Sequence, residues 1–179
     1  MTVMVAVYLL LTRLPGEAGL ALLAALVLFA LVVCIWGRDW FIARHHTKRR
    51  RWAQAVERYE RFEKKMLKAR WPKLTVILYL GIYSLDGAAI ARNNIGQCLL
   101  NAGDLDGSVR WLRAALQRDP LYAVPYVNLA VIAAMRHDET TARREMTRAL
   151  QLGFNPNSAQ RILRRALDAA NQQSSGDLR

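Results

Sequence analysis

Residues 89–120 read AIARNNIGQCLLNAGDLDGSVRWLRAALQRDP. Apolar residues recur three or four positions apart on both sides of the turn Asn101–Asp104, which is the spacing of one stripe on a helix. Small residues, Gly96 and Ser108, stand where two helix backbones must approach closely, and Pro120 closes the stretch. The stripe consists of Ile95, Leu99, Val109, Leu112 and Ala115. The stretch therefore predicts two short amphipathic helices joined by a turn.

The same pattern returns about 34 residues later. The matched pairs are Asn94 and Asn128, Ile95 and Leu129, Gly96 and Ala130, Ser108 and Ala142, Leu112 and Met146, and Ala115 and Ala149. Gly103 has no matching glycine, because the second turn is Arg136–Asp138, and the closing proline arrives late, at Pro156. This pattern resembles the tetratricopeptide (TPR) repeat family. The resemblance implies an all-α fold, a short TPR-type α-solenoid with repeats at 88–121 and 122–156, a C-terminal capping helix at 157–170 and a flexible tail at 171–179.

In the TPR family, the first helices of successive repeats line a concave groove. The resemblance implies groove residues at Ile90, Asn93, Gln97, Leu100, Asn101, Val124, Val127, Val131, Ala134 and Met135. An amide-rich wall would then face an apolar wall, which suits a peptide because amides pair with its backbone and apolar pockets take its side chains. The cationic clamp of some chaperone-binding members is not matched, because Asn93 and Gln97 replace the cations. The alternative is that these residues are merely solvated or covered by other segments of the chain.

Residues 18–36 carry no charge over 19 positions, close to the ~20 needed to cross a bilayer. We expect a single transmembrane helix at 18–37, with Trp36 and Trp40 at the interface. A buried core helix and a cleaved signal peptide are the alternatives, but the run does not end in small residues. The apolar segment 1–17 is expected to be re-entrant or interfacial; a partner-facing helix and an over-long translation start remain open.

A basic collar follows at 38–51 and is expected to contact lipid headgroups. Its cations are Arg38, Arg44, Lys48, Arg49, Arg50 and Arg51. The positive-inside rule then places the N-terminus outside and the C-terminal domain in the cytoplasm, and the composition favours a bacterial inner membrane. Residues 38–73 hold 13 Lys and Arg against 4 Asp and Glu, a net charge of +9 of the chain's +12, whereas residues 74–170 hold 11 against 8. Because the charge is not on the repeats, nucleic-acid binding by the folded domain is not favoured.

Residues 52–87 are predicted to contain a long amphipathic helix and a degenerate TPR-like hairpin. Ala55, Tyr59, Phe62 and Met66 form one stripe in the first part. Residues 72–85, PKLTVILYLGIYSL, suit a buried strand by propensity, but we predict a helix because the chain offers no second strand to pair with it.

No catalytic site, cofactor or metal site is predicted. The chain lacks a Gly-rich phosphate loop, HExxH and GxSxG, and its two cysteines, Cys34 and Cys98, lie in dissimilar segments without a Cys/His cluster. His45, His46 and His137 are read as surface residues.

The sequence therefore favours a single-pass, membrane-anchored adaptor or scaffold. It would bind partner proteins through the groove, and through the transmembrane helix as well, for assembly or stabilisation of a membrane complex. Two alternatives stay open: a non-catalytic structural subunit of a larger membrane enzyme, and binding of nucleic acid or anionic lipid by the basic arm.

Overall fold

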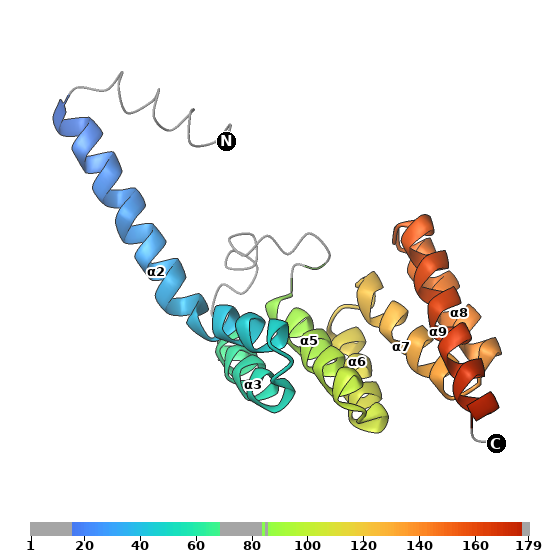
Figure 1. Ribbon diagram of the computed structural model, residues 1–179. Helices are drawn as coiled ribbons and strands as arrows, with labels where there is room; N and C mark the ends of the chain where they lie inside the picture. The colour runs from blue at the N-terminus through green and yellow to red at the C-terminus, as the bar shows by residue number, and fades with distance from the viewer. Residues whose placement is uncertain (1–15, 69–83, 85, 177–179) are drawn as a thin grey trace. The chain divides into compact units, whose positions relative to one another are not determined.

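The computed structural model describes residues 16–68, 84 and 86–176, and all regular structure in these residues is helical. This confirms the prediction of an all-α fold for the part of the chain described (Figure 1). The helices are α2 (Gly16–Lys48), α3 (Trp52–Lys68), α5 (Gly87–Ala102), α6 (Leu105–Arg118), α7 (Ala123–Met135), α8 (Glu139–Gln151) and α9 (Pro156–Gly176).

The chain divides into two compact units, Met1–Arg38 and Asp39–Arg179. The described part of the first unit is the N-terminal portion of α2, which exposes large apolar side chains. They are Leu20, Leu23, Leu26, Val27, Leu28, Phe29, Leu31 and Ile35.

The prediction of a transmembrane helix at 18–37 is wrong. Across the described residues, no helix combines the length and the apolar character that crossing a membrane requires. The apolar run is also not a segment of its own: α2 continues as one 33-residue helix through Arg38 and Asp39 to Lys48, so the predicted collar largely forms its last turns. Nothing in the described residues tests the predicted location and orientation, with the N-terminus outside, and both stay predictions.

The last turns of α2 form a hairpin with α3. Asp39 is buried and accepts hydrogen bonds from Arg58, at 3.2 Å, and from Lys65, both on α3. The ring of Trp40 lies edge-on to Tyr59, with centroids 5.4 Å apart. The predicted helix at 72–85 lies outside the described residues except for Ser84, so among these residues the apolar stripe of α3 packs against α2 and α5.

Helices α5 and α6 form the hairpin that the opening stretch predicts. Ser108 Oγ donates a buried hydrogen bond of 2.7 Å to the carbonyl oxygen of Gly96. A Cβ atom at Gly96 would lie 2.8 Å from Leu112 Cγ, so glycine permits this close approach of the two helices. Gly103 ends α5 in the left-handed region, at φ 89°, which costs glycine nothing.

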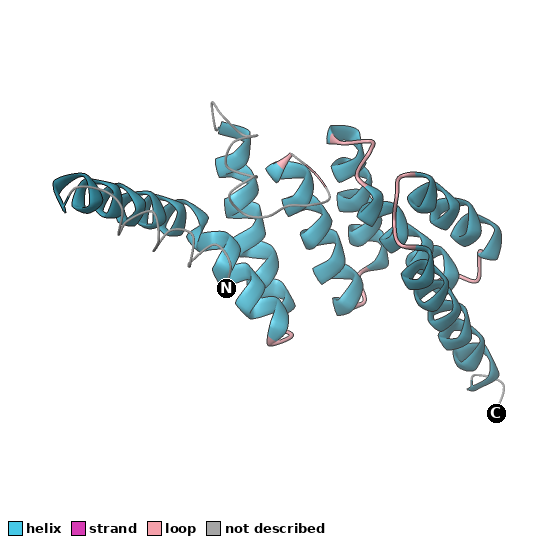
Figure 2. Ribbon diagram, turned by 90° about the horizontal axis from the view of Figure 1, so that it is seen from above, coloured by secondary structure: helices cyan, strands magenta, loops and turns pink. Residues whose placement is uncertain are grey.

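Helices α7 and α8 form the next hairpin, and α9 packs on both. Val127, Ala130, Met146, Ala149 and Ala159 form one buried apolar cluster from the three helices. Each hairpin thus packs on its neighbour, in a solenoid-like arrangement visible from above (Figure 2). Asn155, the residue directly before α9, is its N-cap. The Oδ1 atom of Asn155 accepts a hydrogen bond from the Ser158 N–H at 3.0 Å.

Candidate functional site

Four helical segments contact one another in succession, and we call them the first-helix row. They are the last turns of α2, then α5, α7 and α9. Thr47 Oγ1 of α2 lies 3.6 Å from Cys98 Sγ of α5. Asn128 Nδ2 of α7 donates to Asn93 Oδ1 of α5 at 3.0 Å. The cluster around Val127 joins α7 to α9. We call the accessible side chains of this row the first-helix face; they include Gln97 and Asn101 on α5 and Val131 and Met135 on α7.

The ten predicted groove residues divide into three groups by exposure. Gln97 and Asn101 are exposed. Five are half-buried: Ile90, Leu100, Val124, Val131 and Met135. Three are buried: Asn93, Val127 and Ala134. Seven of the ten therefore remain accessible to a ligand.

Asn93 is the predicted groove residue whose surroundings differ most from a ligand-binding position. It is 3% exposed, and its side-chain oxygen accepts the hydrogen bond from Asn128. A buried amide needs such a partner, because an unsatisfied one costs free energy. The pair therefore ties α5 to α7 and is not open to a partner.

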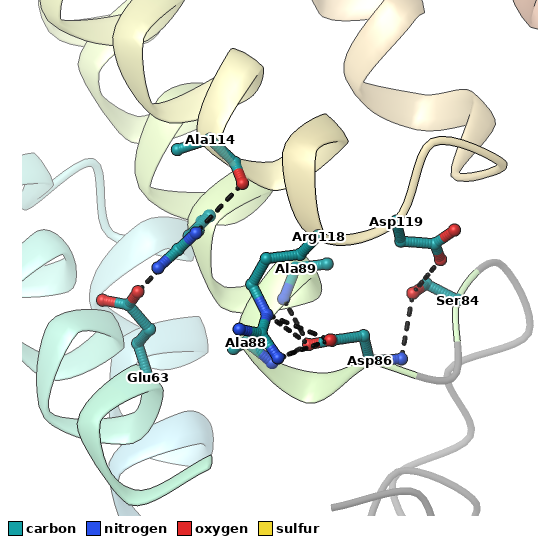
Figure 3. A network of polar contacts seen from close by, with 9 residues as sticks. Glu63, Ser84, Asp86, Ala88, Ala89, Ala114, Arg118 and Asp119 are labelled. Atoms are coloured by element: carbon teal, nitrogen blue, oxygen red, sulfur yellow. Dashed lines mark hydrogen bonds and ion pairs between the residues drawn. The ribbon is translucent and has the colours of Figure 1, made fainter. Parts of the chain in front are cut away.

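Arg92 holds α5 between two other helices. Its Nε donates to Glu63 Oε1 of α3 at 2.6 Å, and its Nη1 donates to the carbonyl oxygen of Ala114 in α6 at 3.0 Å (Figure 3). Glu63 is only 6% exposed, so this is a largely desolvated ion pair. It fixes the N-terminal half of α5, which carries Ile90 and Asn93.

Asp86 begins α5 and binds the end of α6. Its Oδ1 accepts from the N–H groups of Ala88 and Ala89, both at 2.9 Å, and its Oδ2 lies 2.8 Å from an Arg118 nitrogen (Figure 3). Burial raises the pKa of Asp86, but the hydrogen bonds and charge of Arg118 outweigh it and hold that pKa below its ordinary value. This carboxylate is not among the predicted site residues, although an Asp directly before a helical stripe is the usual N-cap signal.

Ser84 extends the same network. Its Oγ donates to Asp119 Oδ2 at 2.6 Å and accepts from the Asp86 N–H at 3.1 Å (Figure 3). These contacts fix the backbone that leads into α5.

The six residues predicted to contact lipid headgroups are all exposed. Arg44, Lys48, Arg49, Arg50 and Arg51 lie in the last turns of α2 and the turn before α3. The described ion pairs include none of these five cations. Their lipid contact stays a prediction.

Two hollows are lined by residues other than the predicted groove residues. One, of about 250 Å³, lies among α6, α7 and α8, with Leu129 and Ile132 inside and Arg113, Arg136 and Arg144 among its charged lining residues. The other, of about 690 Å³, lies along α9 and is lined by Arg161, Arg164 and Arg165.

In residues 16–68, 84 and 86–176, no three His, Cys, Asp or Glu side chains lie together as a metal site would require. Cys98 is buried, and burial raises the pKa of its thiol, which disfavours the nucleophilic thiolate.

No model of a known protein family matches the sequence, and no curated protein matches it either.

Proposed function

We propose that this protein is a TPR-like scaffold whose first-helix face binds a polypeptide segment of a partner protein. Support for the repeat comes from the residues that resemble the family pattern, which occupy the buried positions that such hairpins need. Those in the hairpin interiors are Ile95, Gly96, Ser108, Leu112 and Ala115 in one copy, and Ala130, Ala142, Met146 and Ala149 in the next.

One observation carries the proposal: the first-helix face offers exposed side-chain amides beside half-buried apolar side chains. One of these amides, Asn101 Nδ2, donates to the backbone carbonyl oxygen of Gln97 at 2.8 Å. Gln97 and Asn101 are exposed on α5, and Val131 and Met135 are half-buried on α7. Amides can hydrogen-bond to a peptide backbone, and half-buried apolar side chains gain free energy when a partner covers them. Val131 also packs against the buried cluster of Ala133, Ala134, Ala142 and Ala166, so part of its side chain supports the fold and its remaining surface is available for binding.

A surface of this kind acts by holding a partner, which fits assembly or stabilisation of a larger complex. The reaction chemistry, if the complex performs any, would belong to the partner.

Site-specific photo-crosslinking in the native cell tests the proposal. A photoreactive phenylalanine analogue replaces Gln97 or Val131 in the full chain. The matched control carries the analogue at Arg110, an exposed residue of α6. We expect one crosslinked product of the same mass from positions 97 and 131 and none from 110.

Two results would contradict the scaffold proposal. Equal crosslinking from all three positions would show that the first-helix face is not selective. Crosslinks only from Leu28 or Phe29, on the exposed apolar part of α2, would favour a structural subunit held through that helix.

A further inference from the structure

Three turns in the second unit share a rare backbone conformation. Arg50, Gly103 and His137 each adopt a positive φ, of 56°, 89° and 58°. Each lies between the two helices of a hairpin. Arg50 precedes Gly103 by 53 residues, and Gly103 precedes His137 by 34. Because a positive φ is unfavourable for arginine and histidine, the three positions are set by a common hairpin geometry.

The same two intervals relate the buried residues of the three hairpins. Each has a small residue in its first helix: Ala43, Gly96 and Ala130. Each has a small residue and then a large one in its second helix: Ala55 and Tyr59, Ser108 and Leu112, Ala142 and Met146. All nine are buried. The last turns of α2 and α3 therefore form a third copy of the repeat, which the interval of 34 hides because the interval between this copy and the next is 19 residues longer.

This register places two cations on the first-helix face. At one position of the repeat, α2 has Arg44, α5 has Gln97 and α7 has Val131. The position one turn later is Lys48, Asn101 and Met135. Arg44 and Lys48 are exposed, as are their counterparts on α5. Along the row, the same two positions therefore change from basic to amide to apolar.

The three helices are direct neighbours, so this change occurs over a short distance. Thr47 and Cys98 join α2 to α5, and Asn93 and Asn128 join α5 to α7. Packed helices lie about 8–10 Å apart, so the basic and apolar ends lie roughly 20 Å apart. An extended chain covers that distance in about six residues.

We propose that the first-helix face takes an extended peptide segment in which acidic residues precede or follow apolar residues by about six positions. The acidic side chains contact Arg44 and Lys48, and the apolar side chains contact Val131 and Met135. This inference rests on the proposed scaffold function and names the chemistry of its ligand. An anionic bilayer fits the surface less well, because a headgroup layer presents the same charge along the whole row.

Selection of random displayed peptides on the full chain tests this inference. We expect the enriched peptides to carry Asp or Glu about six positions from Leu, Ile, Val or Phe. The strongest peptide is then labelled with fluorescein, and its affinity is measured by anisotropy. The double variant Arg44→Gln/Lys48→Asn, which gives α2 the residues of α5 at these positions, should weaken binding about tenfold.

The matched control removes the same charge from another surface. In Arg110→Gln/Arg113→Asn on α6, both substituted residues are exposed, and affinity should stay within about twofold because the peptide does not reach them. The variant Val131→Gln/Met135→Asn should weaken binding by removing the apolar contacts. Circular dichroism of each variant checks that the helices remain.

The outcomes separate this inference from the scaffold proposal. Enriched peptides without acidic residues, or an affinity unchanged by Arg44→Gln/Lys48→Asn but reduced by Val131→Gln/Met135→Asn, would overturn the inference alone. If no selected peptide has an affinity that depends on either pair of residues, both the inference and the scaffold proposal are overturned. Binding to vesicles with anionic lipid that is lost in Arg44→Gln/Lys48→Asn, with peptide affinity unchanged, would assign these cations to lipid and also overturn the inference.

Discussion

The hairpins α5–α6 and α7–α8 share one register but pack with different side chains. In the first, Gly96 faces Leu112; in the second, Ala130 and Met146 hold the same positions. Leucine branches close to its backbone and needs the missing methyl of glycine, whereas unbranched methionine can move aside for alanine. The repeat therefore constrains the combined volume of the pair and leaves each residue free to vary.

The two hairpins also differ in how they attach to the rest of the chain. Arg92 binds α5 to α3 through Glu63, and 34 residues later Tyr126 packs in the apolar cluster of α7 and α9. On the N-terminal side of the row a charged contact thus adds to the apolar packing, whereas the corresponding position on the C-terminal side makes an apolar contact. The following predictions test that contrast.

The largest effect is expected from Glu63→Gln. Removing one partner of a largely desolvated ion pair leaves Arg92 without its counter-charge, at a cost of about 3 kcal/mol in the free energy of unfolding. Urea unfolding measures it. The matched control is Glu57→Gln, since Glu57 pairs with Arg61 in full solvent and should cost only about 0.5 kcal/mol. Equal losses in the two variants would refute the charged attachment.

Gly96→Ala should cost about 2 kcal/mol, because its methyl overlaps Leu112 and the core cannot expand freely. Adding Leu112→Met reproduces the pair of the second hairpin. The double variant should then be more stable than the sum of the two single losses predicts, as measured in a double-mutant cycle. Strict additivity would mean that the two hairpins do not solve the same packing constraint.

Stability should fall in acid, and the loss should concentrate on the N-terminal side. Burial raises the pKa of Asp39, but Lys65 and Arg58 outweigh it and lower that pKa, and Arg118 does the same for Asp86. A carboxylate with a lowered pKa in the folded state stabilises it above the unfolded value, about 3.9, and loses that contribution as pH falls through the folded value. Thermal unfolding followed from neutral pH downwards measures this loss.

The variant Asp86→Asn tests whether the Asp86 carboxylate contributes to this loss of stability in acid. It should be less stable at neutral pH and show a flatter dependence on acid pH, because a neutral amide does not titrate. An unchanged acid profile would show that other carboxyl groups set it.

The smallest effect is expected in the turns. His137→Gly should stabilise the protein by about 0.5 kcal/mol, because glycine adopts φ 58° without strain but loses more freedom on folding. Gly103→Ala, at the same position of the other hairpin, should cost about 1 kcal/mol. Urea unfolding measures the change in the free energy of unfolding for both variants. A destabilised His137→Gly variant would mean that the imidazole makes a stabilising contact.

Local patterns in the sequence were sufficient for hairpins α5–α6 and α7–α8. For α5–α6, three features lie within 32 residues: the helical stripe, the small residues Gly96 and Ser108, and the turn at Gly103. Together they predict one helical hairpin. The first hairpin was missed because its first helix is the end of α2, where Ala43 stands among charged residues, and because Arg50 occupies a turn position that usually signals itself by glycine.

By itself, the sequence determined the helical state of the described chain, because apolar periodicity and capping residues act within a few turns of one helix. Only the tertiary structure decided that α2 runs on past residue 37 into a hairpin with α3, and that Asn93 is buried against Asn128. It alone brought Thr47 of α2 against Cys98 of α5, the contact from which we infer that Arg44 and Lys48 lie on the face that carries Gln97 and Val131. These features depend on contacts between residues 19 or more positions apart in the chain. The spacing of residues along the sequence does not show which helix packs on which.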